Sequence, residues 1–391
     1  MTKKAVLLNW ELNSKSGWGI LALNLFFQWA TRADITPLMA YAIYNAALSL
    51  VDPLRLSAVS KAIEVSNNFA DGVAKTPGAR VDFEGTVIDP ISHPDLPTRI
   101  FGKRNIGRCI FENTNIASLV GRLGKFDALL CGSNWNADIL RRQTGRAVNV
   151  IFEGIDPSLF CPGARSGIMD PAKFYIFSGG KVEFRKGQDL VLRAFKEFSK
   201  RHDNAVLVTA WHSPWPRISV GFKGTLDAPL ELDDKGFVNI KKWVSDNGID
   251  ASRVVEIYST PNQLMPTLLR EMHVALQPSR AEACTNLPAM EAMACGVPVI
   301  VGENTGMRDL ITEDNCVRLS GQRMVPQQSP SHSTAGWGES SVDEIVEALE
   351  MLYVDRERRE GIGATGSRWI REHRTWQMHA AQLKDFVLSL D

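Results

Sequence analysis

The sequence predicts an α/β protein of two domains, each built around a parallel β-sheet. Short apolar runs, bounded by polar or Gly/Pro-containing turns, alternate with longer segments of helical periodicity. This alternation is typical of parallel strands joined by crossover helices. The chain of 391 residues is also longer than one hydrophobic core usually supports, so we expect two cores.

The predicted strands fall into two groups of five along the chain. The first group covers residues 5–8, 85–88, 108–111, 128–131 and 148–151. The second group covers residues 174–178, 206–210, 254–258, 274–278 and 297–301. Each group, with the helices between its strands, predicts one Rossmann-like domain.

A segment rich in Pro, Gly and Ser, residues 156–167, lies between the two groups. This composition is typical of an interdomain linker. We therefore expect one domain over residues 1–165 and a second over 166–371, followed by a last helix within 372–391. Two long loops without a recognisable motif are also predicted, at residues 211–237 and 322–339.

The charge balance argues against nucleic acid as a partner. Lys plus Arg and Asp plus Glu number 44 each, so any phosphate site must be local rather than a general basic surface. The six cysteines show neither a C-x-x-C pair nor metal-ligand spacing, which fits reduced thiols in the cytoplasm. No stretch approaches the roughly 20 apolar residues of a membrane span, although contact with the inner membrane surface stays open.

The turn after the first predicted strand contains Gly17 and Gly19 and opens an apolar helix. Such a turn places backbone N–H groups and the positive end of a helix at the carboxyl edge of a sheet, where anions bind. A tight strand-to-helix turn that needs small residues is the alternative interpretation.

A second glycine-containing turn, residues 178–187, leaves the first strand of the second domain. Gly180 allows a ligand to approach the backbone, and Lys181, Arg185 and Lys186 place three cations within six positions. A diphosphate would suit this charge. The alternative is a solvated basic turn.

The segment 278–300 carries the most specific pattern. A polar loop from Glu282 to Asn286 follows a strand, and a predicted helix, 287–294, ends before Gly296. Amides at the helix start suit phosphates, and the carboxylates of Glu282 and Glu291 suit sugar hydroxyls. Glu291 could instead simply complement the helix dipole.

This segment resembles the signature of the family 4 glycosyltransferases, which have the GT-B fold of two facing Rossmann-like domains. The matching positions are Pro278, Ser279, Glu282, Leu287, Pro288, Glu291, Ala292, Met293, Ala294, Gly296, Pro298, Val299 and Ile300. Supporting resemblances lie at 132–136, 154–162, 185–187 and in the last helix around Trp376. The resemblance also implies that helix 372–391 crosses back to the N-terminal domain.

The resemblance implies transfer of a hexose from a nucleoside-diphosphate sugar, with retention and with no cofactor beyond this donor. Glu282 would contact the donor sugar and Glu291 the ribose hydroxyls. Diphosphate contacts would come from Arg185, Lys186 and the amides around Thr285, Asn286 and Leu287, while Gly17 and Gly19 would close over the donor. Because no Asp-x-Asp pair is present, we expect no metal. The acceptor would be a glycan, a lipid-linked sugar or a small molecule.

Three positions depart from the family pattern. Eight residues separate Glu282 from Glu291, one more than usual. Gly180 stands where the family has an arginine, which leaves Lys181 as a substitute. Glu112 replaces a histidine of the first domain, so Glu112 and its neighbour Asn113 become candidates to orient the acceptor hydroxyl and accept its proton. The other candidate for that role is His93; for Glu112, capping of the next turn is the alternative.

Two other functions remain open from the sequence. One is a second kind of two-Rossmann enzyme, a sugar-nucleotide epimerase or a phosphorylase, although no context for a pyridoxal-phosphate lysine is present. The other is a catalytically inactive nucleotide-sugar sensor or partner subunit, which the missing histidine and the longer glutamate spacing favour.

Overall fold

The computed structural model describes residues 3–32, 34–48, 50–92, 99–213, 215–327 and 333–390. Within these ranges, the contacts divide the chain into two compact units. Unit 1 comprises Met1–Asp156, Pro261–Gln263 and Arg374–Asp391, and unit 2 comprises Pro157–Thr260 and Leu264–His373. The chain therefore leaves unit 1 after Asp156, contributes Pro261–Gln263 to it, and returns to it at Arg374.

In the described part of unit 1, six parallel strands form one sheet in the order β2-β1-β3-β4-β5-β6. Their bounds are β1 Lys4–Leu8, β2 Ile35–Met39, β3 Val81–Ile91, β4 Ile100–Cys109, β5 Ala128–Cys131 and β6 Val148–Val150. The five predicted strands of the first group are confirmed, with β4 ending before Ile110. The prediction missed β2 because Pro37 interrupts its apolar run, and proline is accommodated here because β2 lies at the sheet edge.

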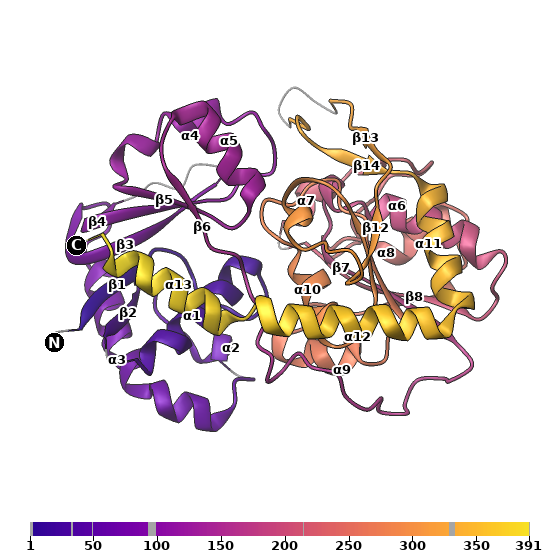
Figure 1. The fold of residues 1–391 in the computed structure, drawn as a ribbon, viewed down its shortest axis with the longest axis horizontal. Coiled ribbons are helices and arrows are strands. Elements are labelled where there is room, and N and C mark those ends of the chain that lie inside the picture. The colour runs from indigo at the N-terminus through magenta and orange to yellow at the C-terminus, as the bar shows by residue number, and fades with distance from the viewer. Residues whose placement is uncertain are drawn as a thin grey trace. The chain divides into compact units, whose positions relative to one another are not determined.

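The helices of unit 1 are α1 Gly17–Ala30, α2 Asn45–Leu48, α3 Pro53–Ala74, α4 Ala117–Val120, α5 Asn134–Thr144 and α13 Trp376–Leu388, with the 3-10 turn η1 Leu123–Lys125. Figure 1 shows α13, the last helix, beside α1 of the same unit. The indole Nε1 of Trp29 donates to the carbonyl of Ala380 at 2.9 Å, and Lys384 pairs with Asp34 at 2.9 Å. The C-terminal helix is therefore an integral part of the N-terminal unit.

In the described part of unit 2, six parallel strands form a second sheet in the order β12-β11-β10-β7-β8-β9. Their bounds are β7 Phe174–Lys181, β8 Ala205–His212, β9 Val254–Glu256, β10 Val274–Gln277, β11 Val299–Gly302 and β12 Val317–Leu319. All five predicted strands of the second group are present. The prediction missed β12, in which Arg318 separates the apolar residues Val317 and Leu319.

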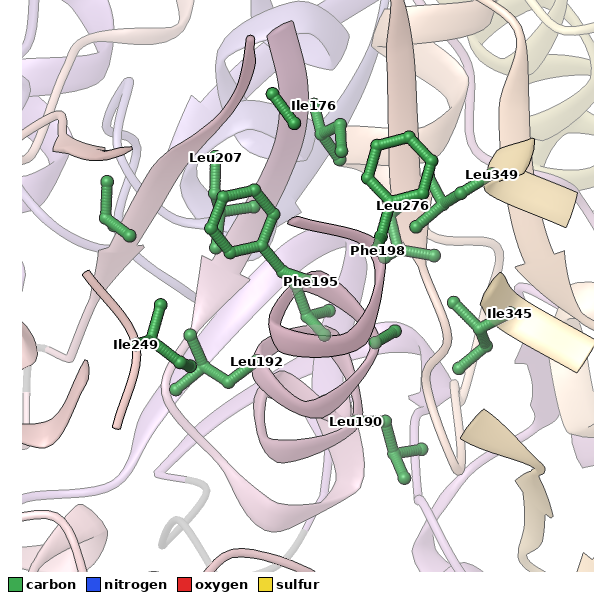
Figure 2. Packing of buried hydrophobic residues seen from close by; sticks show 14 of the residues in the cluster. Ile176, Leu190, Leu192, Phe195, Phe198, Leu207, Ile249, Leu276, Ile345 and Leu349 are labelled. Atoms are coloured by element: carbon green, nitrogen blue, oxygen red, sulfur yellow. The ribbon is translucent and has the colours of Figure 1, made fainter. Parts of the chain in front are cut away.

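The helices of unit 2 are α6 Gln188–Ser199, α7 Pro216–Ser219, α8 Ile240–Asp246, α9 Met265–Leu269, α10 Leu287–Ala294, α11 Val342–Val354 and α12 Arg356–His373. Its 3-10 turns are η2 Phe184–Lys186, η3 Ala251–Arg253, η4 Asn262–Leu264 and η5 Thr305–Asp309, of which η4 begins within the short piece assigned to unit 1. Figure 2 shows Phe195 and Phe198 of α6 packed with strand residues such as Leu207 and with Leu349 of α11. This core fixes the start of α6 against the sheet.

Two segments predicted as loops contain regular structure. The segment 322–339 includes an antiparallel ribbon of β13 Gln322–Met324 and β14 Gly338–Ser340, visible in Figure 1. In 211–237, β8 continues to His212 and the short helix α7 follows. No helix in the described ranges combines the length and apolarity required to span a bilayer.

Candidate functional site

The two motif-bearing loops of unit 2 meet where neighbouring strands end. Since β7 and β10 are adjacent and parallel, the turn after β7 and the loop after β10 emerge at the same edge of the sheet. The N–H of Arg280 donates to the carbonyl of Arg185 at 2.6 Å. Gly187 has φ 72°, and a Cβ there would lie 2.5 Å from the carbonyl oxygen of Pro278. The glycine is therefore needed for the close approach of the loops.

At this junction Glu282 is surrounded by donors. Its carboxylate contacts Arg185 Nη1 at 2.9 Å and Lys186 Nζ at 2.7 Å. The hydroxyl of Ser279 and the amide of Asn286 donate to the same carboxylate at 2.7 and 2.9 Å. Glu282 is only 5% exposed, so these contacts replace water almost completely. The structure brings the predicted sugar-binding carboxylate and the predicted phosphate-binding cations into direct contact.

A charged cluster at this junction comprises Lys181, Glu183, Arg185, Lys186 and Glu282. The cations of this cluster keep its two carboxylates ionised. Burial opposes ionisation of Glu282, but the charges of Lys186 and Arg185 outweigh it and lower the Glu282 pKa. Burial also acts on Glu183, whose pKa is nevertheless lowered to about 2, chiefly by Arg185 and Lys181. Glu183 pairs with Arg185 Nε at 2.7 Å and with Lys181 at 3.0 Å. These three cations and two carboxylates together carry one net positive charge, which suits an anionic ligand.

The start of α10 lies beside the cluster. Asn286 caps the helix, because its Oδ1 accepts the N–H of Ala289 at 3.3 Å. The hydroxyl of Thr285 contacts the sulfur of Met290 at 2.9 Å. Glu291 is buried in the second turn of α10, and the first turn contains no acidic residue. A helix dipole acts mainly on the first turn, so the simple dipole interpretation of Glu291 does not fit its position.

The predicted phosphate turn of unit 1 is stabilised by its own side chains. Ser16 caps α1, since its hydroxyl accepts the N–H of Gly19 at 3.1 Å. Asn13 Oδ1 accepts N–H bonds from Lys15 and Ser16 at 3.0 and 2.9 Å. A Cβ on Gly19 would overlap the Asn13 side chain at 2.2 Å. The tight-turn interpretation therefore accounts for Gly19, and Gly17 is the first residue of α1.

The acceptor-side candidates follow β4 in unit 1. Glu112 and Asn113 are both half-buried. The side-chain oxygen of Asn113 accepts the N–H of Asn115 at 3.0 Å, which closes a local turn. His93, the other candidate for this role, lies outside the described residues.

Sequence reasoning missed Thr305, which holds the Glu282 backbone. Thr305 has φ 41°, a conformation that strains a β-branched residue. Its hydroxyl accepts the N–H of Glu282 at 2.8 Å, and the N–H of Gly306 donates to the Glu282 carbonyl at 2.9 Å. The only signal in the sequence is position, because these residues follow the carboxyl end of β11.

Replacing Gly187 with alanine is expected to destabilise the protein by about 3 kcal/mol, because the methyl group would meet both an unfavourable φ and the Pro278 carbonyl. The matched control is Gly236→Ala. Gly236 has φ 81°, but a Cβ there would have no described atom within 4 Å, so we expect about 1 kcal/mol. Denaturant midpoints measure both effects. Equal losses would mean that the contact with Pro278 is unimportant.

Comparison with protein families assigns a known family to this region of the chain. The family model described as "Family 4 Glycosyltransferase in conflict systems" matches residues 139–383, which is more than half of the chain. The matched region contains both loops of the cluster and all of α10.

Curated relatives match over about half of the chain. A GDP-mannose-dependent alpha-(1-6)-phosphatidylinositol monomannoside mannosyltransferase of Mycobacterium tuberculosis is 25% identical over 209 residues, or 52% of this chain and 44% of the relative. D-inositol 3-phosphate glycosyltransferase 1 of Catenulispora acidiphila is 30% identical over 194 residues, or 47% of this chain and 43% of the relative. The matches thus span less than half the length of these relatives.

Solved structures resemble the chain over nearly its full length. Sucrose-phosphate synthase from Thermosynechococcus elongatus matches with a TM-score of 0.65 at 14% identity, covering 99% of each chain. HepE from Anabaena, solved with UDP and glucose, matches with a TM-score of 0.61 at 12% identity, covering 99% of this chain and 100% of HepE. At such low identity these likenesses establish the fold alone, which is GT-B.

Proposed function

We propose, because this chain belongs to the family 4 glycosyltransferases, that it transfers a hexose from a nucleoside-diphosphate sugar to an acceptor hydroxyl. The observation that carries this proposal is the buried Glu282 carboxylate held between Arg185 and Lys186 beside the start of α10. Cations and a carboxylate at one point suit a ligand that has both phosphates and sugar hydroxyls.

The chemistry requires stabilisation of two charges. The bond between the anomeric carbon and the diphosphate breaks, and the sugar passes through an oxocarbenium-like state. In our proposal Lys181, Arg185 and Lys186, with amides at the start of α10, stabilise the departing diphosphate. Glu282 orients the sugar hydroxyls, and Glu291 binds the ribose. These protein charges would do the work of a metal, and the reaction would proceed with retention.

On the acceptor side, we assign Glu112 and Asn113 to the attacking hydroxyl. The acceptor oxygen forms the new bond to the anomeric carbon, and Glu112 accepts the hydroxyl proton. Gly17 and Gly19 would contribute from the same unit to closure over the donor. The named relatives act on a phosphatidylinositol mannoside and on an inositol phosphate. We therefore extend the proposal to a polyol or lipid-linked acceptor at the inner face of the membrane.

A thermal-shift screen with UDP- and GDP-sugars tests donor binding, because a ligand of the native state raises the apparent melting temperature. At about 100 times its Kd, the correct donor contributes about 2.7 kcal/mol. Sugar transfer is then measured with hydroxyl-bearing acceptors in excess chelator, where we expect full activity. Loss of activity in chelator would refute metal independence alone.

The same experiment separates the transferase from a nucleotide-sugar sensor. Binding of a donor without turnover on any acceptor would favour the sensor. The extra residue between Glu282 and Glu291 also favours this alternative. Conversion of the donor without an acceptor would indicate an epimerase. The absence of both binding and turnover with every donor tested would refute the proposed function.

A further inference from the structure

Arg280 is the most enclosed charged residue of the loop that carries Glu282. Its guanidinium is completely buried and lies over the ring of Phe184, with Cζ 4.0 Å from the ring centroid. Nη1 and Nη2 donate to the two carboxylate oxygens of Asp189 at 2.8 and 2.7 Å. Nη1 also donates to the Phe184 carbonyl at 2.7 Å, and Nε donates to Glu339 at 2.6 Å. All three guanidinium nitrogens are thus hydrogen-bonded.

These contacts join separate segments of unit 2. Phe184 begins the η2 turn that carries Arg185 and Lys186, and Asp189 lies in the first turn of α6. Glu339 belongs to β14 of the ribbon. We call the η2 turn, which carries Arg185 and Lys186, the cation turn. Because the planar guanidinium donates in several fixed directions, the Arg280 side chain connects the cation turn, α6 and the ribbon to the loop of Glu282.

The ribbon contacts the same loop through its backbone and through Asn304. The N–H of Gly338 donates to the carbonyl of Arg280 at 3.1 Å. Asn304 Nδ2 contacts the carbonyls of Ser279 and Gly338 at 2.9 and 3.2 Å. The ring of Trp337 lies 6.1 Å from that of Phe184. The ribbon therefore supports the Glu282 loop and the cation turn together.

We propose that Arg280 is a positioning residue for the donor site, and that its bond to Glu339 makes the ribbon part of the support. The proposal rests on the proposed function for the identity of the ligand. Arg280 holds the Arg185–Lys186 turn against the Glu282 loop. The distances from these two cations to the Glu282 carboxylate therefore stay fixed. Loss of the contact between Arg280 and Glu339 lets the two loops separate and weakens their binding of a diphosphate sugar.

The test compares Glu339→Ala and Glu339→Gln with the control Arg323→Ala. Glu339 is partly exposed, so its replacement leaves the buried pair of Arg280 and Asp189 intact. Arg323 lies exposed on the partner strand β13. We expect Glu339→Ala to raise the donor KM about fivefold with a smaller change in kcat, Glu339→Gln to recover most of the loss, and Arg323→Ala to match the parent protein. Arg280→Lys should behave like Glu339→Ala or worse, because an ammonium cannot bridge the same partners.

Amide hydrogen exchange provides a readout that needs no ligand. Glu339→Ala should speed exchange in residues 184–187 and 279–286 as well as in β14, whereas Arg323→Ala should leave both loops unchanged. Exchange that changes in the ribbon alone, or a donor KM equal to that of the parent protein, would overturn the positioning role. If the parent protein binds no nucleotide sugar, the proposed function fails, and the exchange result still decides whether Arg280 couples the ribbon to the two loops.

Discussion

Replacing Glu282 with glutamine is expected to lower sugar transfer by about a hundredfold or more while nucleotide binding is preserved. The substitution keeps the shape of the side chain and removes its charge. In the structure this carboxylate contacts Lys186, Arg185 and Ser279, so its position is fixed before any ligand arrives. Loss of one preorganised electrostatic partner of a transition state typically costs about 10²–10³-fold in kcat. Binding of the free nucleotide should persist, because the cations then carry more uncompensated charge.

The matched control for this variant is Glu183→Gln, which removes another carboxylate from the same cluster. Glu183 pairs with Arg185 and Lys181, and among the described contacts Arg185 is the one donor that it shares with Glu282. We expect its turnover to stay within about tenfold of the parent protein. Steady-state kinetics with the donor found by thermal shift, combined with direct nucleotide titration, measure both variants. Equal losses would show that the net charge of the cluster matters and the place of the carboxylate does not.

The sequence predicted those parts of the molecule that depend on local pattern. The helix predicted at 287–294 agrees with α10, because Asn286 supplies an N-terminal cap and Gly296 follows its end with a positive φ. The strands of both sheets were recognisable wherever an apolar run was flanked by turn residues. The edge strand containing Pro37 was not recognisable, because its conformation is set by pairing with β1 rather than by its own residues.

The sequence identified candidate residues for the site, but it did not predict the contacts between them. Glu282, Arg185 and Lys186 were recognised in two separate motifs, and their direct pairing depends on the adjacency of β7 and β10. Arg280 stands at a variable position of the motif, and its partner Glu339 lies 59 residues away. Long-range hydrogen bonds of this kind leave no local signal, so only the folded chain identifies these two residues.

Replacing Asp189 with asparagine is expected to destabilise unit 2 by about 3–5 kcal/mol, which is the usual cost of removing one partner of a buried ion pair. Asp189 and Arg280 are both completely buried, and their bidentate pair has no access to water. Burial disfavours the charged guanidinium, but Asp189 and Glu339 outweigh this effect and raise the pKa of Arg280. An asparagine would leave that charge opposed by Glu339 alone among the described contacts.

The surroundings of Asp189 leave little room for relaxation. Its Oδ2 accepts the N–H and the hydroxyl of Thr225 at 2.8 and 3.0 Å, and Gly224 lies so near that a Cβ there would overlap the carboxylate. The asparagine NH₂ would therefore face other donors in either orientation. The control is Glu360→Gln, which removes an exposed ion pair of similar length with Arg356 and should leave stability unchanged. The two variants are compared by denaturant midpoint at constant m-value. An Asp189→Asn midpoint equal to that of the control would show that the buried pair of Asp189 and Arg280 does not stabilise unit 2.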